Sequence, residues 1–451
     1  MSGKCTYDFL LSVMIFLMAG LVSCTPDWQD EMIPHPVSPD QIGTSMGDRE
    51  SNTDTRKVML LYSDAFNSLS SYLNEDIEDL CEGWIPDMRR AEDVILVYSH
   101  QPAARGRYNE KTSPVLFRLY AGPDETVIRD TIVIYKPETV STSASQFNNV
   151  LSYIKENFPA KSYGLLYSSH ATGYLPSGFY SKPGSYVFSE GMMRSQGRNT
   201  FSLPVPVPYI EPEQDPDLPA VKSVGQSVVG NLSYEMDLKD FAEAIPMKLD
   251  YILFDACLMG GIEVAYELAG KCDKVGFSQA EVLAEGFNYK TLASHLLGNR
   301  PESDPYSVCE DYFTQYDIQT GVYRSATISL VDCNKLEPLA ELCNRLFDKY
   351  SEQMKSIRAS NVQRFYRSSK HWFYDLQSIL ENAGITEQEM DELTEVLEGC
   401  VLYKGATPSF MGEFPIDTFS GFSMYLPSNG HSELSKYYKT LKWNAATGLV
   451  K

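Results

Sequence analysis

The stretch Tyr251-Ile252-Leu253-Phe254-Asp255-Ala256-Cys257 decides the fold. It is a short, continuous apolar run, which is the pattern of a strand covered on both faces. A similar run at 163–170 ends on a histidine, and others occur at 58–62, 94–98 and 274–278. Segments with helical spacing at 69–81, 143–158 and 259–269 alternate with these runs. The alternation predicts an α/β fold in which a mostly parallel sheet is flanked by helices.

Two of these runs end on residues that can carry chemistry, His170 and Cys257. Active sites of open parallel sheets form at the carboxyl ends of strands, so the sheet would bring the two residues to one edge. The thiolate is the reactive form of cysteine. A nearby imidazolium and the positive end of a helix opening near Met259 would both lower the thiol pKa. Either residue alone favours a buried structural role, whereas both at strand ends favour a nucleophile–base pair.

Asp255 stands two residues before the cysteine, so both side chains point the same way in a strand. A carboxylate beside a nucleophilic thiol raises the thiol pKa, and it therefore needs another task. Binding the Lys or Arg side chain of a substrate is such a task. The alternative is a carboxylate that pairs with a core arginine or accepts backbone hydrogen bonds.

Around these residues the sequence resembles the clostripain family of cysteine peptidases. The segment 254–260, continued by 263–268, is similar to the nucleophile segment of that family. The segment 170–174 resembles the family's His-Gly-x-Gly motif with a following aromatic, and it differs at Ala171, where the family prefers glycine. Together with similar segments at 278–289 and 421–427, the resemblance covers most of 57–430. It implies a caspase-like three-layer sandwich with a C-terminal α+β elaboration.

The resemblance also implies roles for individual residues. Cys257 would be the nucleophile and His170 the general acid and base, while the backbone N–H groups of Ala171 and Cys257 would stabilise the oxyanion. The pocket for the residue before the scissile bond would contain Asp255 and Ser278, with Glu281 or Glu285 adding negative charge. The implied activity is cleavage after Arg or Lys.

The long segment at about 171–231 is rich in Gly, Ser and Pro. Family members are often precursors cut in this loop, and Lys182, Arg194 and Arg198 are candidate self-cleavage points. Ala171 raises a second question. If its position requires a positive φ, alanine would be strained and the oxyanion hole displaced, which would leave a weakened or inactive enzyme.

The N-terminus predicts export. Residues 1–23 have the form of a secretory signal, and Leu21-Val22-Ser23-Cys24 resembles a lipobox in which Cys24 is acylated. An ordinary signal peptide with a chance cysteine is the alternative. We expect a flexible tether over 24–56, a peptidase core over 57–300 and a packed C-terminal elaboration over 301–451. The expected location is the cell envelope, with lipid anchoring and acidic residues after Cys24 that indicate the outer membrane.

The amino-acid composition limits the classes of partner and cofactor that we expect. The 451 residues carry 38 Lys and Arg against 60 Asp and Glu, a net charge of −22, which argues against nucleic acid. The nine cysteines form no zinc-like spacing, and no Asp-rich cluster supports the calcium that the resemblance would allow, so we expect no cofactor. The predicted function is a secreted, lipid-anchored cysteine endopeptidase acting on proteins or peptides after basic residues. The alternative is a catalytically inert surface lipoprotein of the same fold that binds protein or peptide.

Overall fold

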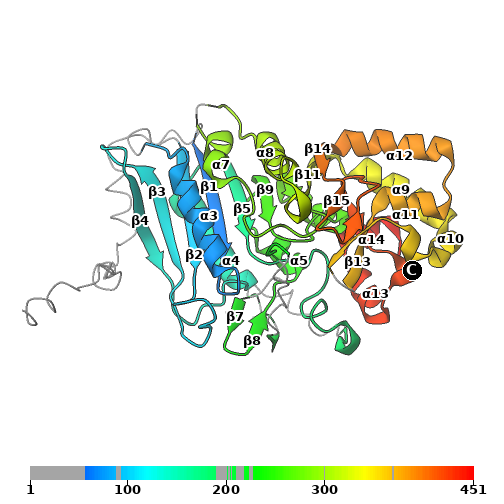
Figure 1. Cartoon of the computed structure of the whole chain (residues 1–451), viewed down its shortest axis with the longest axis horizontal. Coiled ribbons are helices and arrows are strands. Elements are labelled where there is room, and N and C mark those ends of the chain that lie inside the picture. The colour runs from blue at the N-terminus through cyan, green and yellow to red at the C-terminus, as the bar shows by residue number, and fades with distance from the viewer. Residues whose placement is uncertain are drawn as a thin grey trace, which may run out of the picture. The chain divides into compact units, whose positions relative to one another are not determined.

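The computed structural model describes residues 56–87, 93–188, 201, 204, 206–209, 218–222, 227–298, 300–367 and 370–451, which belong to one compact unit. Its centre is a nine-stranded sheet in the order β14-β11-β10-β9-β5-β1-β2-β3-β4 (Figure 1). The strands of this sheet are β1 (Lys57–Asp64), β2 (Asp93–His100), β3 (Val115–Ala121), β4 (Val127–Ile134), β5 (Ser162–Ser168), β9 (Leu249–Asp255), β10 (Cys272–Phe277), β11 (Thr327–Asp332) and β14 (Val401–Ala406).

The five central strands, from β2 through β1, β5 and β9 to β10, run parallel, and the two strands at each edge run antiparallel. Their apolar runs are buried on both faces; every residue of β1 is buried, for example. Burial on both faces is what a continuous apolar run predicts for a parallel strand. The expected α/β class with helices on both faces is therefore confirmed.

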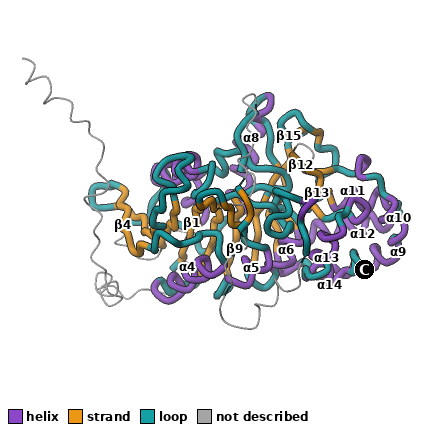
Figure 2. Tube along the Cα trace, turned by 90° about the horizontal axis from the view of Figure 1, so that it is seen from below, coloured by secondary structure: helices purple, strands orange, loops and turns teal. Residues whose placement is uncertain are grey.

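Helices cover both faces of the sheet. Figure 2 places α8 on one side of the strands and α4, α5 and α6 on the other. The helices are α3 (Ser70–Glu82), α4 (Ala144–Asn157), α5 (Leu238–Ala244), α6 (Ile262–Leu268), α7 (Tyr289–Leu296), α8 (Pro305–Asp317), α9 (Glu337–Lys349), α10 (Ser351–Ser356), α11 (Leu376–Ala383), α12 (Glu387–Cys400), α13 (Ser432–Tyr438) and α14 (Lys442–Thr447).

Helix α3 shows how a helix delivers a polar group to the site. Its buried stripe consists of Leu73, Ile77 and Leu80, the helical spacing seen in the sequence. Asp76 lies on the same stripe and is buried with it. A carboxylate on the apolar face of a helix needs a buried partner.

Smaller sheets complete the fold. The strands β12 (Arg364–Arg367), β13 (Lys370–Asp375) and β17 (Ser423–Met424) form one of them. Two further sheets are formed by β15 (Ser409–Phe410) with β16 (Phe414–Pro415), and by β6 (Val207–Pro208), β7 (Ser227–Val229) and β8 (Leu232–Tyr234).

The structure departs from the predicted elements in several places. The strands expected to end on His170 and Cys257 end two residues earlier, at Ser168 and Asp255. The helix expected at 259–269 begins at Ile262, because residues 258–261 form a turn instead. The segment 301–451, expected as a C-terminal elaboration packed on the core, contributes β11 and β14, which extend the sheet beyond β10.

The predictions for the N-terminus concern residues that the structure does not describe. The signal at 1–23, Cys24 and the tether up to residue 55 lie outside the described residues. Within the described ranges, we find no helix whose length and hydropathy would suit a membrane-spanning segment.

A buried carboxylate joins the core to the C-terminal segment. Glu263 in the first turn of α6 is fully buried, and it accepts hydrogen bonds from the Tyr425 N–H (2.9 Å) and the Tyr438 hydroxyl (2.7 Å). Burial raises the pKa of Glu263 to about 7, although both hydrogen bonds oppose the shift.

This shift predicts a pH-dependent stability difference. A raised folded-state pKa contributes stability below the unfolded value of about 4.5, and the contribution is lost as pH rises through about 7. Between pH 5 and pH 8 the wild-type protein should therefore lose of the order of 3 kcal/mol relative to Glu263→Gln. Denaturant unfolding at both pH values measures this. Glu341→Gln, an exposed site on α9, is the control, and an equal pH dependence in wild type and Glu263→Gln would contradict the assignment.

Candidate active site

The carboxyl ends of the parallel strands bring the candidate residues to one edge of the sheet. Ser168 at the end of β5 pairs with Asp255 at the end of β9. His170 follows β5 by two residues, and Cys257 follows β9 by two. Both are buried, with His170 5 % and Cys257 0 % exposed. The edge that the sequence indicated therefore holds both residues.

A strained turn fixes the cysteine. Leu258, directly after Cys257, has a φ of 61°, a left-handed conformation that costs a non-glycine residue energy. The turn is held by hydrogen bonds from the Leu258 N–H to the Ala280 carbonyl (2.9 Å) and from the Gly260 N–H to the Ser278 carbonyl (2.7 Å). The Cys257 Sγ accepts a hydrogen bond from the Val282 N–H at 3.1 Å. The segment 278–282 thus positions the sulfur.

The histidine turn packs directly on the cysteine turn. Gly173 has a φ of 61°, and a Cβ added there would lie 2.4 Å from the Leu258 carbonyl oxygen. This glycine allows the two backbones to approach. Ala171 is not among the described residues with positive φ. The strain considered for alanine at that position therefore does not arise, and the glycine requirement lies two residues later.

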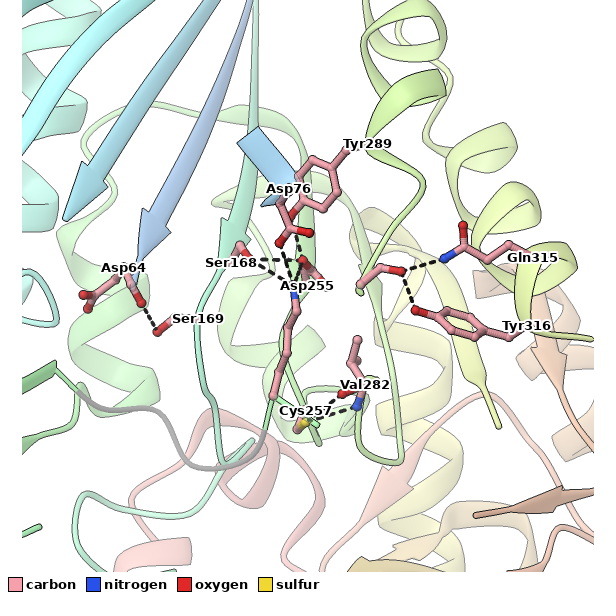
Figure 3. Close-up of polar contacts among 12 residues, drawn as sticks. Asp64, Asp76, Ser168, Ser169, Asp255, Cys257, Val282, Tyr289, Gln315 and Tyr316 are labelled. Carbon is pink, nitrogen blue, oxygen red and sulfur yellow. Dashed lines mark hydrogen bonds and ion pairs between the residues drawn. The ribbon is translucent and has the colours of Figure 1, made fainter. Parts of the chain in front are cut away.

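Asp255 binds a lysine of the same chain. The Nζ of Lys222 forms ion pairs with Asp255 and, at 3.0 Å, with Asp76 of α3 (Figure 3). Lys222 is 0 % exposed. The Ser168 hydroxyl donates to Asp255 at 3.1 Å, and the Tyr289 hydroxyl does so at 2.6 Å. The sequence left two roles open for Asp255. It could bind the basic side chain of a substrate, or it could pair with a core arginine or accept backbone hydrogen bonds. In the structure it binds a basic side chain, that of Lys222, which belongs to the long loop.

The backbone of Lys222 lies beside the cysteine as well. Its N–H donates to the Val282 carbonyl at 2.9 Å, and the Ala284 N–H donates to the Ala220 carbonyl at 2.8 Å. Val221 and Leu283 form an antiparallel bridge. Residues 220–222 therefore pair as a short added strand with the segment whose Val282 N–H contacts the Cys257 sulfur.

Electrostatics keep the pair uncharged in this state. Burial lowers the pKa of His170 to about 3; a hydrogen bond to the Lys222 backbone opposes the shift, and the charges of Lys222 and Arg367 reinforce it. Burial, then Glu281, raise the pKa of Cys257 well above its usual value, and the same two cations oppose that shift. At neutral pH the structure thus holds a thiol and a neutral imidazole. The expected help from a helix near Met259 is missing because α6 begins at Ile262.

The remaining predicted pocket residues have other partners. The Ser278 hydroxyl donates to the Ala280 carbonyl (3.1 Å) and shares a hydrogen bond with Thr327 (2.8 Å), so it supports the segment that positions the sulfur. Glu281 is paired with Arg367 of β12 at 3.5 Å, and burial raises its pKa to about 7. Glu285 is exposed. Of the predicted pocket residues, Asp255 is the one in contact with Lys222.

Sequence reasoning missed Asp76, Lys222, Tyr289 and Arg367. Asp76 carried a usable signal, because a carboxylate on an apolar helical stripe indicates a buried partner. Lys182, a candidate self-cleavage point, is exposed, and Arg194 and Arg198 lie outside the described residues. Across the described ranges, there is no group of three or more His, Cys, Asp or Glu side chains that could hold a metal ion.

The chain is similar to known proteins of one family. The sequence profile of the clostripain family matches residues 61–185 and 213–448. An inactive zymogen C11 protease from Parabacteroides distasonis is 25 % identical, with a TM-score of 0.66 over 88 % of this chain and 98 % of that one. A secreted C11 cysteine protease from Bacteroides thetaiotaomicron, in complex with an irreversible peptide inhibitor, is 22 % identical, with a TM-score of 0.66 over 87 % and 98 %. Among curated proteins, none matches the chain.

The contact between the two turns predicts a sensitive glycine. Gly173→Ala forces a Cβ into the Leu258 carbonyl at a positive φ, and we expect a loss of about 2 kcal/mol or more in the free energy of unfolding. Hydrogen exchange at the Leu258 amide should accelerate. Gly184→Ala is the control, because a Cβ there would meet no described atom within 4 Å. Equal stability of the two variants would show that the turns do not pack this way.

Proposed function

The chain belongs to the clostripain family of cysteine peptidases, and we propose that it cleaves proteins or peptides after basic residues through Cys257 and His170. The observation that supports this specificity is that the side chain of Lys222 is buried in a pocket beside Asp255 and Asp76. A lysine is rarely buried completely unless it is paired, and this one is enclosed by two carboxylates. The same enclosure would accept the basic side chain of a substrate.

Substrate would bind as residues 220–222 do. An extended peptide adds as a strand along the segment around Val282, with backbone hydrogen bonds giving affinity and the Asp255 pocket giving specificity. The complex of the similar Bacteroides thetaiotaomicron protein with an irreversible peptide inhibitor supports the binding of a peptide substrate. The residue in the pocket then presents its carbonyl to the cysteine.

The chemistry follows from the groups at that position. His170 takes the proton of Cys257, the sulfur attacks the carbonyl carbon, and the N–H groups of Ala171 and Cys257 stabilise the oxyanion. His170 then returns the proton to the leaving amine, and water hydrolyses the thioester. Both side chains must first lose the burial that holds them neutral, because it raises the pKa of Cys257 and lowers that of His170. Removal of Lys222 from the pocket is one route to that exposure.

For location, we propose export to the cell envelope with acylation at Cys24, which rests on the lipobox-like Leu21–Cys24 and the preceding apolar run. The partners are then a membrane, reached through the anchor, and a protein or peptide substrate with basic residues. No step here requires calcium or another cofactor.

The nucleophile assignment predicts loss of activity in one variant. Reporter peptides with Lys, Arg, Ala or Glu before the scissile bond should show turnover of the Lys and Arg peptides. Cys257→Ala should lower kcat/KM for them at least 1,000-fold, by the order of magnitude known for removed nucleophiles. Cys309→Ala, another buried cysteine, should retain activity.

Two other outcomes would contradict either the assignment of Cys257 as the nucleophile or the proposed peptidase activity. Turnover that survives Cys257→Ala would show that the nucleophile is another group. No turnover of any peptide, with no alkylation of Cys257 by a basic chloromethylketone, would favour the inert peptide-binding lipoprotein.

The pocket assignment predicts altered specificity. Asp76→Asn and Asp255→Asn should each lower kcat/KM for the Lys peptide roughly 10- to 100-fold, because a desolvated ammonium would lose one of its two counter-charges. The Ala peptide, which places no charge in the pocket, should be much less affected. Glu75→Gln, exposed beside Asp76 on α3, is the matched control. An unchanged ratio of Lys to Ala turnover in both aspartate variants would refute the pocket.

A further inference from the structure

We propose that Cys272 and Cys333 form a disulfide bond when the folded protein meets a low-molecular-weight disulfide such as oxidised glutathione. The bond joins the first residue of β10 covalently to the residue that follows β11. Neither Cys257 nor the pocket around Lys222 takes part, so this modification is independent of the proposed function.

The two sulfurs are already in contact. The Cys272 Sγ lies 3.7 Å from the Cys333 Sγ, and both thiols are free. The sulfurs of a disulfide are about 2 Å apart, so each has to move by roughly 1 Å or less. A movement of this size needs rotation of the two side chains rather than rearrangement of the strands.

The backbone that carries the two cysteines belongs to the main sheet. Strands β10 and β11 pair antiparallel, so Cys272 and Cys333 lie at the same end of this ladder. A regular continuation of the ladder would place Cys333 opposite Asp273, with its side chain on the other face from Cys272. A 3-10 turn over Cys333–Lys335 begins there instead, and it brings the Cys333 sulfur to Cys272.

Hydrogen bonds fix this turn from two sides. The Asp332 carboxylate accepts from the Asn334 N–H at 3.0 Å, and the Asn334 side-chain amide donates to the Asp273 carboxylate at 2.9 Å. Cys272 is 0 % exposed and Cys333 is 4 % exposed. The two sulfurs therefore meet inside a junction that the surrounding contacts hold together.

Within the described ranges, no other two cysteines have their sulfurs in contact. The Cys400 thiol, for example, donates to the Leu397 carbonyl at 3.5 Å. A single buried cysteine packs as a small apolar residue, and the same packing is the alternative for Cys272 and Cys333. The contact between two thiols is what distinguishes this pair.

Two thiol–disulfide exchanges form the bond. The thiolate of Cys333, the more exposed of the two, attacks one sulfur of the small disulfide, and the other sulfur leaves as a thiolate. The Cys272 thiolate then attacks the Cys333 sulfur of the mixed disulfide and displaces the second small thiolate. Together the two cysteines lose two protons and two electrons, and the oxidant ends as two small thiols.

The bond secures the strand pair that supports the candidate nucleophile. At the other end of the ladder, the Thr327 hydroxyl contacts the Ser278 hydroxyl (2.8 Å) and accepts from the Ala280 N–H (2.9 Å). A cross-link from 272 to 333 closes a loop that restricts the unfolded chain far more than the folded one. The proposed envelope location would let such a bond persist, because that compartment is not kept reducing as the cytosol is.

A peptide map identifies the bond. The full chain is unfolded and reduced, refolded into a buffer of reduced and oxidised glutathione, and blocked with N-ethylmaleimide. Trypsin then releases Cys272 and Cys333 in the peptides 272–274 and 325–335, neither of which contains another cysteine. We expect mass spectrometry without reductant to find these two peptides linked in most of the protein. Glutathione adducts on both peptides, links to other cysteines, or two unlinked peptides would each overturn the proposal.

The same oxidation in denaturant shows whether the fold selects the pair. An unfolded chain favours short loops, so Cys333 should there pair with Cys343 more often than with Cys272. We expect the yield of the link between Cys272 and Cys333 to be several-fold lower in denaturant than in native buffer. Equal yields would show that the folded structure does not bring these thiols together.

The bond also predicts a stability that depends on the redox state. Addition of a reductant to the oxidised wild type should lower the Tm by about 5 °C, whereas Cys272→Ala should not respond. Cys343→Ala, at another fully buried cysteine on α9, is the matched control and should respond as the wild type does. An unchanged Tm in the wild type would contradict the proposal. Should Cys272→Ala fail to fold, the peptide map of the wild type still decides.

Discussion

The ion pairs of Lys222 with Asp255 and Asp76 are the constraint on which the site depends. They join a loop, a strand end and a helix that are far apart in the sequence. Taking three charges out of water is costly, and the cost is offset only when every remaining group is satisfied. Ser168 and Tyr289 supply hydrogen bonds to Asp255. Gly286 leaves space for these ion pairs because it has no side chain. A Cβ there would lie 2.5 Å from the Asp255 carboxylate and 2.6 Å from the lysine nitrogen.

The sequence predicted those parts of the fold and the site that local pattern determines. Continuous apolar runs predicted the parallel strands, and strand ends placed His170, Asp255 and Cys257 at one edge. The turn after Cys257 could not be predicted from the local pattern, because the helical spacing continues through 259–261. In the structure, hydrogen bonds to the segment 278–280 hold the chain there in a turn. A tertiary constraint of this kind overrides local propensity. The role of Lys222 could not be predicted for the same reason, since the composition of the loop does not indicate which of its lysines is buried in a pocket.

The C-terminal region is part of the site's construction rather than a separate addition. Strands β11 and β14 extend the main sheet, and Arg367 in the hairpin of β12 and β13 pairs with Glu281 beside the cysteine segment. Its positive charge offsets part of the rise that Glu281 causes in the pKa of Cys257. A boundary drawn from the change in pattern near residue 301 could not reveal this, because strand order and register are decided by pairing between distant segments.

The pocket's two carboxylates link its contents to its charge. Without a cation, buried Asp76 and Asp255 would repel each other, and burial already raises the pKa of Asp76, so a proton would be taken up in place of the lost ammonium. A basic side chain that enters must displace that proton, whereas a neutral one leaves the pocket protonated and gains no ion pair. In the proposed function, discrimination between substrates would therefore arise from the cost of burying these carboxylates, and the same cost favours retention of Lys222 in the pocket. One electrostatic arrangement would thus account for both the burial of Lys222 and the proposed preference for basic residues.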